Sequence, residues 1–189
     1  MSAIMSLSGK TPVQVIDESV LYEELENCSC FKFIAFKELR MPFRHTGFLL
    51  FFDNVPKYTI NVRTEDDSWS HWLQSLVVAP GRTTVESAES LGNVKYVGRP
   101  VVHVLNSDEE RAAARSDLKT MLEPKRWYSL LWQNCRNHVQ GIMGRLDDRH
   151  PGLRDAGHRE LQQIYAEDWT LFTLIGLLVM IPIAVVLKR

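Results

Sequence analysis

The 189-residue chain has only three cysteines, no excess of basic residues and no long apolar segment near its N-terminus. A small, odd number of cysteines excludes a disulfide-stapled scaffold and favours a reducing compartment. The formal net charge of −1 argues against a nucleic-acid-binding protein, because such proteins gain affinity by neutralising phosphates. Residues 1–12 also lack a basic segment followed by an apolar run, so no signal peptide is expected.

Residues 169–187 form a run of 19 residues without a charge, which Lys188 and Arg189 follow. As a helix this run would be about 28 Å long, close to the ~30 Å hydrocarbon core of a membrane. We therefore expect a transmembrane helix in a tail-anchored protein whose body is cytosolic, at the endoplasmic reticulum, mitochondrial outer or peroxisomal membrane. A buried core helix is the alternative. The two terminal basic residues, taken alone, would favour the opposite orientation.

Without this anchor the body has 168 residues, a net charge of −3 and no internal repeat. At about 150 residues per domain, this length predicts a single folded domain. We expect a flexible N-terminus over residues 1–18, the folded domain over residues 19–146, and a polar, turn-rich linker over residues 147–168. The linker has room for one short helix.

Apolar and alternating segments predict strands in the first half of the body. Residues 30–37 are rich in aromatics and partly alternate, and residues 45–52 are apolar almost throughout, as in a strand covered on both faces. Turn-forming residues at 53–56 separate this run from residues 57–63, which alternate between apolar and polar side chains. These two runs predict an antiparallel hairpin with a longer loop.

The second half of the body combines strand and helix signals. Residues 94–105 are typical of a strand that is broken near its middle. Ser107 and Glu110 form a capping-box signature, which predicts a helix that runs to about residue 122. A second helix is expected to begin at about Cys135.

Cys135 is the residue with the greatest chemical interest. Asn134 is a suitable N-cap, and the helix that follows carries an apolar stripe formed by Val139, Ile142, Met143 and Leu146. Cys135 precedes Val139 by four residues, so it is expected on the same inward face and in the first turn. There the backbone N–H groups and the helix dipole favour an anion, and therefore the thiolate of a nucleophilic cysteine. A small buried cysteine without chemistry is the alternative.

A nucleophilic thiol needs a base, and His45 opens the apolar strand where that strand meets a loop. The segments 44–51 (Arg-His-Thr-Gly-Phe-Leu-Leu-Phe) and 134–139 (Asn-Cys-Arg-Asn-His-Val) resemble those of the lecithin:retinol acyltransferase-like proteins. These are NlpC-type papain-like enzymes in a permuted form, in which the histidine precedes the cysteine. The spacing of 90 residues and the apolar C-terminal segment are also similar.

The resemblance implies an α+β, circularly permuted papain-like domain, with an antiparallel sheet packed on the helix that bears the cysteine. It also implies that Cys135 attacks an acyl ester while His45 accepts and then returns a proton, through an acyl-thioester. We therefore expect a membrane-anchored thiol hydrolase or acyltransferase acting on a membrane lipid, with no cofactor, metal or nucleic acid. A cysteine peptidase or isopeptidase of the same fold, and a non-catalytic tail-anchored adaptor, are the alternatives.

The family's acyltransferases typically carry a second histidine on the next strand, which this sequence lacks. Asn61 is the preferred replacement and Thr59 the alternative, because an amide can orient an imidazole as it does in papain-like enzymes. Gln133 or the backbone N–H of Cys135 are candidates for an oxyanion hole, beside Asn134. His138 follows Cys135 by three residues, within reach of the thiol, and a supporting or surface role is preferred for it.

The remaining chemical groups carry weaker signals. Cys28 and Cys30 form a single Cys-x-Cys motif, and the sequence has no second pair of ligands at the spacing typical of a zinc site. These two thiols are therefore expected to be inert. Four histidines are interpreted as isolated surface residues or as buried residues with satisfied hydrogen bonds: His71, His103, His150 and His158.

Overall fold

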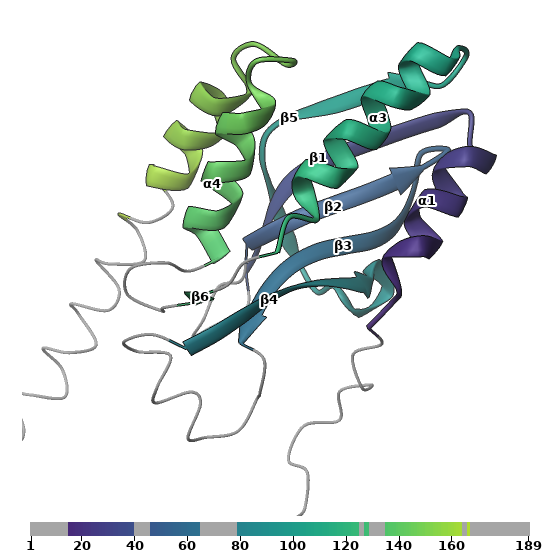
Figure 1. Ribbon diagram of the computed structural model, residues 1–189. Helices are drawn as coiled ribbons and strands as arrows, with labels where there is room; N and C mark the ends of the chain where they lie inside the picture. The colour runs from purple at the N-terminus through teal and green to yellow at the C-terminus, as the bar shows by residue number, and fades with distance from the viewer. Residues whose placement is uncertain are drawn as a thin grey trace, which may run out of the picture.

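The computed structural model describes residues 15–39, 46–64, 79–124, 127–128, 135–163 and 166. In this part of the chain, helices lie across one face of an antiparallel sheet (Figure 1). The α+β class and the antiparallel sheet predicted from sequence are confirmed.

The sheet consists of five long strands and one two-residue strand among the described residues: β1 (Cys30–Glu38), β2 (Thr46–Phe52), β3 (Val55–Thr64), β4 (Ala79–Ser87), β5 (Val94–Val104) and β6 (Trp127–Tyr128). Their order is β5-β1-β2-β3-β4-β6, and every neighbouring pair is antiparallel. The predicted break in β5 is an irregularity within a continuous strand. There Gly98 has a φ of +72°, and the register against β1 shifts between Phe33 and Ala35.

β2 lies inside the sheet, and all seven of its residues are buried. Phe48, Leu50 and Phe52 belong to the main core, which the helices cover, and we call this side the helix face. Leu49 and Phe51 pack with Ile34 and Phe36 in a second cluster on the opposite face. The prediction of a strand covered on both faces is therefore confirmed.

The β2–β3 turn is shorter than predicted. Asp53 and Asn54 form it alone, with φ values of 50° and 65°, and β3 starts directly afterwards at Val55. Aspartate and asparagine tolerate this left-handed backbone, and two such residues in a row give the tight turn that matches the twist of a hairpin. The longer loop predicted over residues 53–56 is wrong, because Val55 and Pro56 already belong to the strand.

The helices include α1 (Glu18–Asn27), the short 3-10 helix η1 (Ala88–Ser90), α3 (Asp108–Met121) and α4 (Cys135–Leu146). α3 begins as predicted, because the Ser107 side chain accepts a hydrogen bond of 3.2 Å from the backbone N–H of Glu110. α1 has no counterpart among the predicted elements. Its buried residues are only Leu21 and Leu25, which is too few to produce a clear helical pattern.

The segment predicted as a linker over residues 147–168 contains the one short helix that the prediction allowed, and this helix packs against the core. Residues 153–163 are helical, and Leu153 and Leu161 are buried in the main core. The backbone N–H of Gly98 also donates a 2.8 Å hydrogen bond to Glu160 Oε2. The folded body therefore extends to residue 163, although polar residues surround the few apolar ones that fix this segment.

Some predictions fall outside the described residues. These are the N-terminal residues 1–14, the catalytic candidate His45, the oxyanion candidates Gln133 and Asn134, and the anchor over residues 169–187. Of the helices that are described, none has both the length and the apolar character needed to cross a membrane.

Candidate functional site

Cys135 is the first residue of α4 and is buried, with 7% of its surface exposed. Val139, Ile142, Met143 and Leu146 are buried in the main core, so the predicted inward stripe of α4 is confirmed. Through this stripe α4 packs against β2 and β3. The thiol therefore occupies the first turn of a helix that is held against the centre of the sheet.

The strand that α4 contacts is the one that follows the predicted base. β2 begins at Thr46, the residue directly after His45. The structure thus packs the cysteine-bearing helix on the antiparallel sheet, against the strand that begins directly after His45. Since His45 lies outside the described residues, its pairing with Cys135 stays a prediction.

Asn61 lies on β3, where the polar side chains are buried rather than exposed to solvent. Its exposed fraction is 3%, and its Nδ2 donates to Thr59 Oγ1 at 2.9 Å and to Glu86 Oε2 at 3.1 Å. Thr84 Oγ1 donates to the other oxygen of Glu86 at 3.0 Å. These four residues form a polar network between β3 and β4 inside the protein.

This network lies on the sheet face opposite α4. Asn61 Oδ1 faces Gly47 of β2, beside the ring of Phe36 from the second cluster. That oxygen is buried and accepts no hydrogen bond from the described residues. The structure does not bring Asn61 or Thr59 toward Cys135, and their predicted role in orienting His45 stays a prediction because His45 is not described.

The other predicted site residues divide into two groups. His138 lies on α4 one turn after Cys135 and is half-buried, whereas Gln133 and Asn134 lie outside the described residues. Of the other two thiols, Cys28 is buried and Cys30 is partly exposed. Burial, followed by the charge of Asp53, raises the pKa of Cys28, which favours the unreactive thiol.

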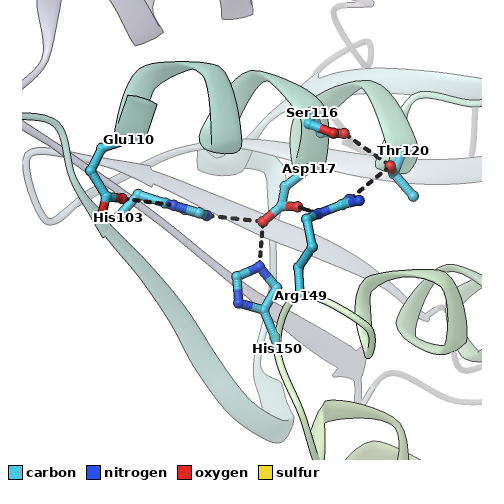
Figure 2. Close-up of polar contacts among 7 residues, drawn as sticks. All are labelled: His103, Glu110, Ser116, Asp117, Thr120, Arg149 and His150. Atoms are coloured by element: carbon cyan, nitrogen blue, oxygen red, sulfur yellow. Dashed lines mark hydrogen bonds and ion pairs between the residues drawn. The ribbon is translucent and has the colours of Figure 1, made fainter. Parts of the chain in front are cut away.

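A second group of polar residues was not predicted from the sequence (Figure 2). His103 from β5 and His150, which follows α4, both place Nε2 against Oδ2 of Asp117 on α3, at 2.9 Å and 2.5 Å. Arg149 Nε donates to the other oxygen, Oδ1, at 2.7 Å. The Asp117 side chain is fully buried.

The side chains around Asp117 favour its ionised form. Burial by itself raises the pKa of Asp117, but the hydrogen bonds from His103, His150 and Arg149 together outweigh burial and lower it. His103 and His150 are therefore not isolated from each other, but the predicted alternative of histidines with satisfied hydrogen bonds is confirmed for both. A signal for His103 exists in the sequence, because it shares the inward side of β5 with Val101, but no local pattern links it to His150.

Comparison with protein-family models, curated proteins and solved structures gave no match to this chain. The roles assigned to its side chains therefore rest on their own chemistry and placement.

Proposed function

We propose that the protein is a thiol-dependent acyl hydrolase or acyltransferase, with Cys135 as nucleophile, His45 as base and membrane lipid esters as substrates. The observation that carries this proposal is the placement of Cys135. It is an inward-facing residue at the start of α4, and α4 packs on the strand that directly follows His45.

The proposed reaction proceeds in two steps. His45 takes the thiol proton of Cys135, the sulfur attacks the ester carbonyl, and the proton passes to the departing alcohol as its bond to the carbonyl carbon breaks. Water, an amine or a second alcohol then attacks the thioester and releases Cys135. The N-terminal end of α4 suits the developing oxyanion, because the helix dipole places partial positive charge there.

A lipid substrate is favoured by the uncharged run of residues 169–187. An anchor in the membrane holds the thiol close to lipid esters, which raises their effective concentration without any additional contact. The same arrangement would bring no such advantage to an enzyme that cleaves soluble peptides, so the peptidase alternative lacks this support.

The test is the intact mass of the full chain after incubation with phosphatidylcholine vesicles. We expect a fatty-acyl adduct that disappears in Cys135→Ser and persists in the matched controls Cys28→Ser and Cys30→Ser. An adduct that survives in Cys135→Ser, or no adduct at all on the folded wild-type chain, would contradict the proposal. Modification of Cys135 by a peptide-based acyl electrophile, without any lipid adduct, would instead indicate a peptidase.

A further inference from the structure

We propose that His103, Asp117 and His150 bind a divalent transition-metal ion of the zinc type, at a site separate from Cys135. The three residues come from β5, from α3 and from the turn after α4. The site is independent of the proposed acyl chemistry, since it shares no residue with it.

The ligand atoms already converge. One ligand atom from each of the three residues lies within 4.8 Å of the other two, and Figure 2 shows the three side chains pointing toward a common point. Asp117 is fully buried, and the side chains of His103 and His150 are 6% and 19% exposed. Two imidazole nitrogens and one carboxylate oxygen form a donor set that zinc accepts.

The contacts around the ligands also suit a metal ion. Glu110 Oε2 lies 3.7 Å from Nδ1 of His103, and Arg149 Nε binds the Asp117 oxygen that the histidines do not contact. In known metal sites, a ligating histidine is oriented by a carboxylate at its other ring nitrogen, and a ligating carboxylate is oriented by a hydrogen-bond donor at its other oxygen.

His103 faces carboxylate oxygens with both of its ring nitrogens. A neutral imidazole has a single N–H, so one nitrogen would present its lone pair to an anion. A metal ion at Nε2 removes this conflict, because the N–H then lies at Nδ1 and points toward Glu110.

Binding would require a small expansion of the cluster. Ligand atoms around a tetrahedral zinc ion, each about 2.0–2.1 Å from the metal, lie ~3.3 Å apart. The present separations of 2.9 Å and 2.5 Å are those of hydrogen bonds, in which Nε2–H groups donate to Oδ2. The ion would take the place of the Nε2 hydrogens, and each histidine would then carry its single N–H at Nδ1.

Three protein ligands leave a fourth position for water. The partly exposed side chains of His150 and Arg149, at 19% and 38%, provide the route from solvent. Because the ligands come from three segments, a bound ion would join β5, α3 and the end of α4. Binding only to the folded chain would stabilise it, by an amount that grows with the logarithm of the free ion concentration above the Kd.

The test measures zinc binding to the full chain, purified in mild detergent and stripped with EDTA. We expect one equivalent of Zn²⁺ by calorimetry and an increase in melting temperature on addition of ZnCl₂. His150→Gln and Asp117→Asn should weaken binding by at least about 100-fold, and Glu110→Gln by about 10-fold. The matched control is His158→Gln, which changes an exposed histidine that forms hydrogen bonds with Gln140 and Gln162.

Two readouts keep the proposal falsifiable if a variant unfolds. Binding of Co²⁺ to the wild-type chain should give the visible spectrum of a tetrahedral nitrogen and oxygen site, without a thiolate band. Unchanged metal affinity in Cys28→Ser and Cys135→Ser would support ligation by the two histidines and Asp117 rather than by a thiol. No zinc-dependent stabilisation of the wild-type chain, a thiolate band, or full affinity in folded His150→Gln would each overturn the proposal.

Discussion

Gly47 on β2 and Asn61 on β3 touch across the hairpin so closely that no larger residue fits at position 47. A Cβ atom there would collide with Asn61 Oδ1 and with the backbone oxygen of Ile60. The contact fixes Asn61 in its buried network with Glu86 and explains why a small residue interrupts an otherwise large apolar strand.

Gly47→Ala should therefore destabilise the protein. Overpacking of this kind costs about 1–3 kcal/mol in the free energy of unfolding, which chemical denaturation can measure. The matched control is Gly144→Ala within α4, where an added Cβ meets no atom within 4 Å. That change should raise stability by about 0.5–1 kcal/mol, and a destabilised control would contradict the steric explanation.

Asn61→Ala should lower stability without affecting the chemistry of Cys135. Glu86 loses a donor inside the protein, and an incompletely satisfied buried group costs about 1–3 kcal/mol. Because Asn61 faces away from α4, acylation of Cys135 should be unchanged in the folded variant. Loss of acylation at unchanged stability would instead show that Asn61 orients His45.

The turn that contains Asp53 should make stability depend on pH. Asp53 Oδ1 accepts hydrogen bonds from Ser29 N, Ser29 Oγ and Cys30 N at 2.9, 2.8 and 3.1 Å, and those from Ser29 lower the pKa of Asp53 most. Because the pKa of Asp53 is lower in the folded state than in the unfolded state, its ionised carboxylate stabilises the folded protein at pH values above the unfolded pKa of about 4. This stabilisation is lost as the pH falls through the pKa of the folded state.

Asp53→Asn keeps the tolerance for positive φ but removes the charge. We expect this variant to be less stable than the wild-type chain at pH 7, with the difference shrinking below about pH 4. Asp148→Asn is the control, since Asp148 is exposed and outside this turn. Thermal unfolding across this pH range gives the comparison, and a difference that grows on acidification would be the contrary result.

Cys28 should resist alkylation in the folded protein. Its exposed fraction is 3%, its Sγ contacts the Leu25 carbonyl oxygen at 3.6 Å, and burial raises its pKa. Peptide mass analysis after iodoacetamide treatment should show Cys28 modified only in denaturant, and the partly exposed Cys30 modified in the native chain. Equal native rates for the two would contradict this.

Local patterns in the sequence were sufficient for several elements. Alternation predicted β3, the capping serine predicted the start of α3, and the spacing of Val139 and Ile142 predicted the buried face of α4. Each of these signals depends only on residues that lie within a single strand or within two turns of one helix. It can therefore be recognised without knowing what the segment packs against.

The sequence by itself thus determined the positions of β1, β2, β3 and β5, and that Cys135 starts a helix with its apolar stripe facing inward. It did not predict β4 or β6. Only the tertiary structure decided that Asn61 faces away from that helix, because both faces of the sheet are buried and the polar side of β3 is therefore not the solvent side. It also decided the meeting of His103, Asp117 and His150. Their contact depends on β5 returning to pair with β1, and such pairing between distant segments leaves no periodic trace in the residues themselves.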